Sequence, residues 1–129
     1  MRTAQQQAGD EAEGFVAARL EGLGWTILGR NVRAGRGELD LVAVDPGPPR
    51  ELVIVEVRRR SSRAFGLAEE TVAYRKRSHL RVAIGRLLED GLRGDEPLPS
   101  LPLRVDLVVV DPRSGSASLR MRHYHAIAL

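Results

Sequence analysis

Several kinds of residue are missing or scarce in this chain, and each absence excludes a class of protein. There is no cysteine, so disulfides and thiolate metal sites are ruled out. Aromatic residues make up only 4% of the chain, which argues against a platform for base stacking. No apolar run reaches the about 18 residues of a membrane span, and the polar segment 1–14 lacks the apolar core of a signal peptide. These absences predict a cytoplasmic protein.

Lysine is almost absent too. Of the twenty Lys and Arg residues only Lys76 is a lysine, and the many arginines explain a sequence pI of about 10.1 at a net charge of only +3. A mildly positive charge is compatible with nucleic-acid binding but does not establish it. A length of 129 residues predicts a single domain over residues 1–129, in which about the first eight residues, 1–8, are disordered.

The hydrophobic pattern predicts a definite order of helices and strands. The first helix is marked by apolar residues at helical spacing: Ala12, Val16, Leu20 and Leu23. A second helix covers about 72–89, and a turn rich in Arg and Gly is expected at 31–36. Strands are predicted in four apolar segments and in a last strand or extended tail: 25–30, 38–45, 51–57, 103–111 and 117–129. This order predicts a small mixed sheet with helices packed against it.

Acidic residues interrupt the two most apolar strands. Because side chains alternate along a strand, Glu38 and Asp40 share one face, and Glu56 and Arg58 share one face of the next strand. The short Pro/Gly loop between them predicts antiparallel neighbours, so that the three acids and the arginine converge on one patch. An ionised buried carboxylate needs a cationic partner, so the patch is either a salt-bridged cluster or a site for a divalent metal.

The two helices can each add a charge to this patch. At about 100° per residue, Glu13 lies on the flank of the first apolar stripe, where it is either solvated or reaches the edge of the core. Lys76 falls near the middle of the second stripe. Either its ammonium group snorkels to water, or it reaches the carboxylates.

Arginines surround the acidic segments. Arg59, Arg60 and Arg63 follow the third strand, where they could grip a phosphate backbone if the acids bind metal. The alternative is a solvated charged segment. Arg36, just before the first acid, admits the same two interpretations.

The order of these segments resembles that of the YraN family of endonuclease-like bacterial proteins: "GELDLV", "IVEVRRR", "FGLAEETVAYRK", "RVDLVVV" and "RHYHAIAL". That family belongs to the PD-(D/E)XK nuclease superfamily and is related to archaeal Holliday-junction resolvases. The resemblance covers nearly the whole chain. It implies an α/β fold with a restriction-endonuclease-like core, in which a central mixed sheet is flanked by helices in α-β-β-β-α-β order.

The resemblance also implies an activity, namely endonuclease cleavage of DNA, including branched or structured DNA, with Mg²⁺ or Mn²⁺ as cofactor. Asp40 and Glu56 would be the metal ligands, with Glu13 and Glu38 assisting. A homodimer would suit the cleavage of junctions, which needs two active sites.

One departure from the superfamily pattern bears on that activity. Arg58 stands where a catalytic lysine is expected, and arginine supplies positive charge but cannot act as a base near neutral pH. The alternatives are therefore a weakened or inactive nucleic-acid-binding module on the same fold, or a protein-interaction factor whose acids are structural. Lys76 matches a family lysine, so it is not evidently a compensation for Arg58.

Two further features lie outside the implied site. Asp106 matches an aspartate of the family and is expected to be a structural partner for an arginine. His123 and His125 share the spacing of the last segment. Without cysteine or a third ligand at a suitable spacing, they are weak evidence for zinc.

Overall fold

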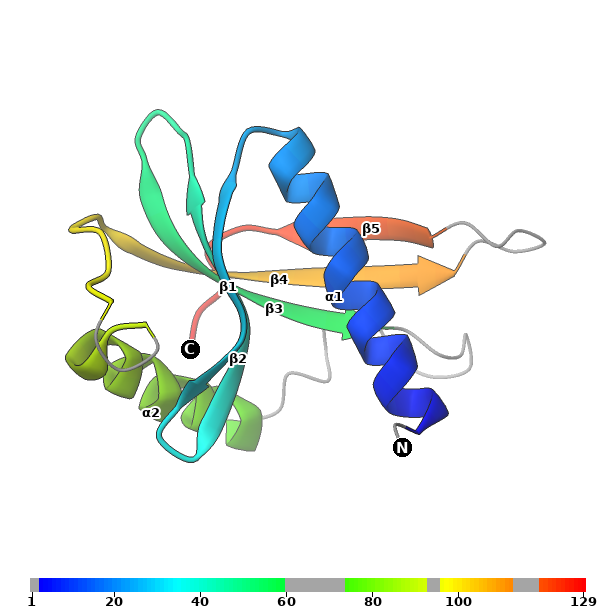
Figure 1. Cartoon of the computed structure of the whole chain (residues 1–129), viewed down its shortest axis with the longest axis horizontal. Helices are drawn as coiled ribbons and strands as arrows, with labels where there is room; N and C mark the ends of the chain where they lie inside the picture. Colours follow the sequence, from blue (N-terminus) through cyan, green and yellow to red (C-terminus); the bar gives the residue numbers. More distant parts are fainter. Residues whose placement is uncertain (1–2, 60–73, 93–95, 113–118) are drawn as a thin grey trace.

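Five strands form one mixed sheet with two helices flanking it (Figure 1). The computed structural model describes residues 3–59, 74–92, 96–112 and 119–129, without the side chains at 5, 74–77 and 112. The elements follow one another in this order: α1 Ala4–Gly22, β1 Thr26–Ala34, β2 Gly37–Asp45, β3 Glu51–Arg59, α2 Tyr74–Asp90, β4 Leu103–Pro112 and β5 Leu119–Tyr124. The α/β class and the predicted order are therefore confirmed.

The strands lie in the spatial order β1-β2-β3-β4-β5. Only β3 and β4 run parallel, and the other neighbours are antiparallel. A parallel connection must cross over the sheet, and α2 lies in that connection. The central position of β3 agrees with its continuous apolar run, because both of its faces are covered.

Helix α1 starts earlier and ends sooner than its sequence pattern indicates. Thr3 and Gln6 form a capping box, so the helix begins at Ala4, inside the segment 1–8 for which the sequence indicates disorder. Its last residue is Gly22, and the chain turns away at Gly24 with a φ of +94°. Leu23, expected in the apolar stripe, has already left the helix and is 65% exposed.

Strand β1 is longer than the sequence predicts. The turn expected at 31–36 is wrong, because β1 continues to Ala34 and only the next two residues turn. Val32 and Ala34 are buried, which explains why these positions stay in the sheet despite their Arg- and Gly-rich neighbours. Asn31 has a φ of +50°, so the strand is irregular at the one point where the sequence suggested a turn.

Each helix covers its own apolar cluster. The cluster under α1 includes Trp25 and residues of β2, β3 and β4, and the cluster under α2 includes residues of β1, β2 and β3. Leu41 belongs to the first cluster and Leu39 to the second, although two residues so spaced on a regular strand share one face. The change of face falls next to Asp40, so the direction of the Asp40 side chain does not follow from regular alternation along β2.

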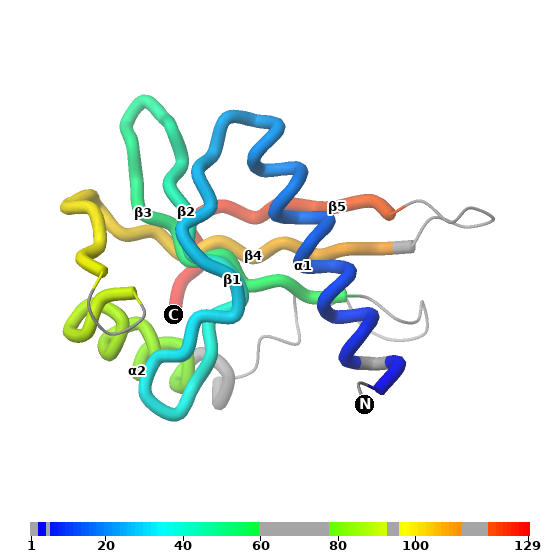
Figure 2. Tube along the Cα trace, viewed as in Figure 1, coloured from blue at the N-terminus to red at the C-terminus, as the bar shows by residue number. Residues whose placement is uncertain are grey.

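The chain returns to the sheet after β5. In Figure 2 the end of the chain lies between the sheet and α2. Ile127 donates its N–H to the carbonyl of Val105 at 2.8 Å, and Arg81 on α2 donates to the carbonyl of Leu129. Among the described residues, no helix has the length and apolar character needed to cross a membrane.

Candidate functional site

Asp40 lies where β2 and β3 part. The regular pairing of these strands runs to Leu41 opposite Val55. Two residues further along β3, the N–H of Val57 donates to Oδ2 of Asp40 at 2.8 Å. Val57 is the middle residue of the "EVR" segment, so the carboxylate of Asp40 lies against the backbone between Glu56 and Arg58. The predicted proximity of Asp40 to this segment is present in the structure.

Glu13 reaches Asp40 from α1. Burial and the negative charge of Asp40 raise the pKa of Glu13 to about 7, against the lowering effect of a side-chain hydrogen bond with Asn31. A side-chain hydrogen bond with Asp40 also raises this pKa. Oε2 of Glu13 is buried and has no hydrogen-bond partner among the described residues. Of the two alternatives for Glu13, the structure therefore favours the one at the edge of the core. We call Glu13 and Asp40 the acidic pair.

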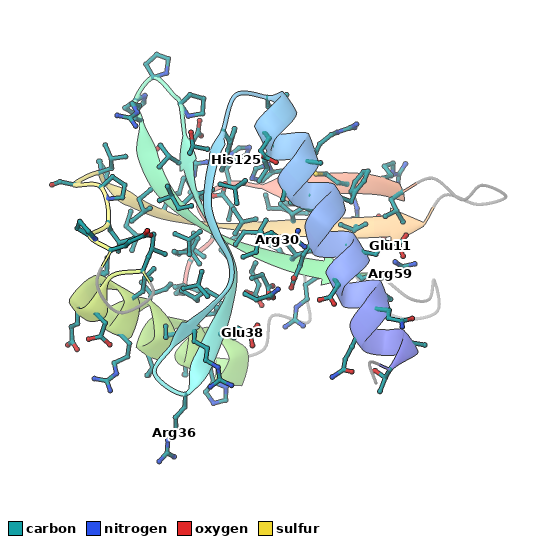
Figure 3. All side chains as sticks on the ribbon, viewed as in Figure 1. Glu11, Arg30, Arg36, Glu38, Arg59 and His125 are labelled. Atoms are coloured by element: carbon teal, nitrogen blue, oxygen red, sulfur yellow. The ribbon has the colours of Figure 1, made fainter. Side chains whose placement is uncertain are left out.

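Two polar residues of β1 join the acidic pair, and the sequence did not single them out. Asn31 contacts Glu13 through the hydrogen bond just described. Arg30 donates to the carbonyl of Asp10 at 3.5 Å, and its guanidinium approaches α1 closely at Gly14. Figure 3 shows Arg30 beside α1. The short polar side chain of Asn31 was the one available signal, because asparagine tolerates positive φ.

The other predicted acids take different positions. Glu56 is 1% exposed and, by strand alternation, lies on the same side of β3 as Ile54, which belongs to the cluster under α2. Glu38 is exposed and lies opposite Arg33 in β1. Among the described acids, the ligand oxygens of Glu13, Asp40 and Glu56 do not all lie within 4.8 Å of one another. The structure thus unites the carboxylates of Glu13 and Asp40, whereas Glu56 lies on the side of β3 that faces the cluster under α2.

The basic residues around the site are only partly described. Arg58 is half-buried, and its Nε is buried without a hydrogen-bond partner in the described part of the chain. Nη1 of Arg59 lies 4.0 Å from Oε2 of Glu11 on α1, and Figure 3 shows both residues on the α1 side of the sheet. Arg36 is exposed at the tip of the β1–β2 hairpin and points away from the molecule.

Three of the predicted residues cannot be placed at the site. Arg60, Arg63 and the side chain of Lys76 lie outside the described residues. The two alternatives for Lys76 therefore both stay open.

The acidic pair fits a hard divalent cation. The two carboxylates are in contact. Glu13 has a raised pKa and a buried oxygen without a hydrogen-bond partner among the described residues, so a bound cation would be favourable there. Oxygen ligands suit Mg²⁺, which binds one or two carboxylates and retains several waters or substrate oxygens. The acidic pair therefore offers oxygen ligands for such a cation, and Glu13 takes a larger part in it than the sequence indicated.

A second charged cluster lies at the other end of the β2–β3 pair, where Asp45 is opposite Glu51. Arg104 in β4 donates to three carboxylates: to Asp106 at 2.9 Å, to Asp45 at 2.9 Å and to Glu51 at 3.0 Å. Its guanidinium lies 5.6 Å from the centre of the Trp25 ring. The prediction that Asp106 is a structural partner for an arginine is confirmed. We call these four charged residues the arginine cluster.

Asp106 is completely buried and fully hydrogen-bonded. Burial alone would raise its pKa, but hydrogen bonds from His123, Arg104 and the N–H of Ala126 lower the pKa to about 2. Nε2 of His123 lies 2.8 Å from Oδ2 of Asp106, and Nδ1 of His125 lies 3.5 Å from the same atom. The third ligand that the two histidines lacked in the sequence is thus supplied by β4.

These features define a class of protein: an α/β protein with a mixed five-stranded sheet, flanking helices and an acidic pair where β2 and β3 part. The chain belongs to the Uncharacterised protein family UPF0102, whose model matches residues 12–110. This confirms the resemblance to the YraN family.

Relatives from several bacteria match most of the chain. A UPF0102 protein of Pseudomonas aeruginosa is 36% identical over 120 residues, which is 93% of this chain and 90% of the relative. A UPF0102 protein of Deinococcus radiodurans is 36% identical over 114 residues, 88% of this chain and 87% of the relative. A UPF0102 protein of Desulforamulus reducens is 41% identical over 88 residues, which is 68% of this chain and 70% of the relative.

Proposed function

We propose that the protein is a metal-dependent endonuclease that hydrolyses phosphodiester bonds in DNA, including branched or structured DNA. The observation that supports this most is the acidic pair held against the backbone of the "EVR" segment by the Val57 N–H. The resemblance of the same segment to the E-x-K motif of nucleases agrees with it. A DNA substrate is consistent with the cytoplasmic location that the sequence predicts.

The carboxylates have distinct roles in this proposal. Asp40 would hold Mg²⁺ or Mn²⁺ together with Glu13, and Glu56 would complete the set from the adjacent position on β3. The cation, when bound, would activate a water molecule and stabilise the charge that develops on the scissile phosphate. Before a cation binds, the pKa of about 7 leaves Glu13 partly protonated near neutral pH, and the cation would displace that proton to solvent. Glu38 is exposed, so it would at most influence how the substrate approaches the site.

The arginines would bind phosphate oxygens. Arg58 would supply positive charge without acting as a base. Arg59 and Arg30 both lie beside α1, near the acidic pair, and would contact the DNA backbone there. Arg36 lies at the hairpin tip and would contact only a longer duplex. Cleavage of a four-way junction would further require a second copy of the site, and hence a homodimer.

A second function is favoured by one observation. Arg58 replaces the usual lysine, and its Nε is buried without a hydrogen-bond partner in the described part of the chain. An arginine also cannot act as the base that a lysine at this position could supply near neutral pH. The protein would then bind structured nucleic acid without cutting it.

A cleavage assay separates the two functions. Labelled linear, flapped and four-way DNA is incubated with tag-free protein in Mg²⁺, Mn²⁺ or EDTA. We expect wild-type cleavage that requires metal and that Asp40→Asn reduces by at least about 100-fold, the size of effect seen when a group that stabilises transition-state charge is lost. Asp90→Asn, which changes an exposed acid at the end of α2, is the control and should cleave normally.

The remaining outcomes decide against the endonuclease. Wild-type protein that binds but does not cut, together with an Arg58→Lys variant that cuts, would establish the second function. Cleavage that persists in EDTA or in Asp40→Asn would refute the role of the acidic pair. If no DNA is bound at low salt, where phosphate contacts are strongest, both functions are wrong.

A further inference from the structure

We propose that Asp106, His123 and His125 form a second metal site, which takes Zn²⁺ or a similar late first-row divalent cation. We call these three residues the tail cluster. Within the described residues they are the one group of three acids or histidines whose ligand atoms all lie within 4.8 Å of one another. Asp106 comes from β4, and the histidines come from the end of β5 and the residue after it. This site is separate from the acidic pair.

The ligand types select the metal. Two imidazole nitrogens and one carboxylate oxygen are the donors of zinc sites that leave a fourth position open to water. Imidazole favours Zn²⁺, Co²⁺ and Ni²⁺ over Mg²⁺, which prefers oxygen alone. The tail cluster and the acidic pair are therefore expected to bind different cations.

The present spacing is close to what a tetrahedral ion needs. Bonds of about 2.0–2.1 Å at tetrahedral angles place ligand atoms about 3.4 Å apart. Oδ2 of Asp106 lies 3.5 Å from Nδ1 of His125 and 2.8 Å from Nε2 of His123. The second distance is a hydrogen bond that has to lengthen by roughly half an ångström. A cation bound at Nε2 would displace the proton of that hydrogen bond, which would pass to Nδ1 of the same ring or to solvent.

His125 has to turn for its lone pair to reach the ion. The rings of His123 and His125 are stacked, with their centroids 4.0 Å apart and an interplanar angle of 13°. Nitrogens in two parallel planes cannot both direct their in-plane lone pairs at one atom. The side chain of His125 is 57% exposed, so it can rotate without disturbing the core.

The charges around the tail cluster leave room for a divalent cation. Arg104 faces the carboxylates of Asp45, Glu51 and Asp106, all within 3.0 Å. The three carboxylates carry more formal negative charge than Arg104 alone offsets. A divalent cation offsets that excess. Partly buried charges are best stabilised when their sum is close to zero.

The carboxylate is already held in a fixed orientation. Arg104 donates to both oxygens of Asp106, and the N–H of Ala126 donates to Oδ1 at 2.9 Å. Such hydrogen bonds orient a metal ligand and usually raise the affinity for the metal by about 10- to 100-fold. The Trp25 ring lies 5.6 Å from the His123 ring and shields one side from water. A bound cation would join β4 to the returning end of the chain.

Cobalt provides a direct test, because tetrahedral Co²⁺ with nitrogen ligands absorbs visible light. Tag-free protein is dialysed against EDTA, freed of chelator and titrated with Co²⁺, followed by competition with Zn²⁺ in a calorimeter. We expect one equivalent to bind and Zn²⁺ to displace it. His125→Ala should weaken binding by more than about tenfold, since a direct ligand contributes at least as much as an outer partner.

Two control variants make the result specific. His79→Ala removes the remaining histidine of the chain, which is exposed on α2, and should bind as the wild type does. Asp40→Asn disables the acidic pair and should also leave Co²⁺ binding intact. Circular dichroism confirms that His125→Ala is folded, which is expected because its side chain is mostly exposed.

Three results would overturn the proposal. The first is a wild type with native circular dichroism that binds no Co²⁺. The second is binding by His125→Ala as tight as that of the wild type, and the third is a loss of binding in Asp40→Asn. The outcome is independent of the proposed endonuclease, since DNA cleavage by His125→Ala in Mg²⁺ is measured separately.

Discussion

The acidic pair and the arginine cluster both place carboxylates beside β3, yet their chemical states are opposite. In the acidic pair, Glu13 has a pKa raised to about 7 and a buried oxygen without a hydrogen-bond partner among the described residues. In the arginine cluster, Asp106 has a pKa lowered to about 2, and both of its oxygens accept hydrogen bonds. One cluster lacks positive charge, and in the other Arg104 supplies it.

This difference indicates what each cluster is for. Buried polar groups in folded proteins are almost always hydrogen-bonded, so the contacts of Arg104 with its three carboxylates need no explanation beyond stability, and the cation proposed at Asp106 would be an addition to them. A carboxylate pair with a perturbed pKa costs stability and is expected where a ligand restores the balance. The arginine cluster is thus the structural reference against which the acidic pair stands out.

The largest expected effect comes from breaking the arginine cluster. Asp106→Asn removes the buried charge that faces the partly buried Arg104 and should lower the free energy of unfolding by about 3–5 kcal/mol. Urea denaturation at pH 7 in EDTA measures it, with Asp90→Asn on exposed α2 as the control. A decrease in the free energy of unfolding below about 1 kcal/mol is what a surface ion pair contributes. Such a result would show that the arginine cluster does not stabilise the fold as a buried ion pair does.

A smaller effect of opposite sign is expected at the acidic pair. The pKa of Glu13 is raised on folding from 4.5 to about 7, so the folded protein loses stability as the pH rises through this window. Glu13→Gln avoids that loss and should be more stable than the wild type at pH 8. Solvent screening of this partly exposed residue limits the gain to about 1 kcal/mol.

The pH dependence of the same variant provides its control. Below pH 4.5 the carboxyl is protonated in both folded and unfolded chains, so the gain should vanish there. Glu21→Gln, an exposed position on the same helix, should show no such dependence. Thermal unfolding from pH 4 to 8 measures both variants. Equal stability of Glu13→Gln and wild type at pH 8 would contradict the raised pKa.

The smallest effect is expected at Asn31, the residue that lowers the pKa of Glu13. The hydrogen bond with Asn31 lowers the pKa of Glu13, so Asn31→Gly should move this pKa further upward. Glycine tolerates the φ of +50° at this position, and the stability should change by less than about 1 kcal/mol. Carbon-13 NMR titration of the carboxyl groups reads the pKa directly. A downward shift would show that Asn31 does not stabilise the charged form.

Much of the fold followed from hydrophobic periodicity, because both helices and the central strands pack apolar residues at regular spacing. The position of Asp40 beside "EVR" also followed, since a short loop fixes how two strands pair. The turn at 31–36 was wrong because its Arg and Gly content outweighed two buried residues, Val32 and Ala34. Asn31 was missed with it, since a residue assigned to a turn is not expected to face a helix, and Arg30, the last residue of the predicted strand 25–30, was not singled out either.

The tail cluster could not be predicted from spacing. Its acid lies in β4 and its histidines lie at or just after the end of β5, and they meet only because Val108 pairs with His123 in the antiparallel sheet. Pairing registers depend on both strands and on the turn, so a local pattern carries no trace of them.

The hydrogen bond from Val57 to Asp40 has a practical consequence. An amide proton that donates to a carboxylate is protected from exchange with solvent only while that acceptor stays in place. The exchange rate of this single proton therefore reports whether the carboxylate has moved, without any substrate or label. A cation or a phosphate that draws Asp40 away would be detected as one amide peak that fades faster in heavy water.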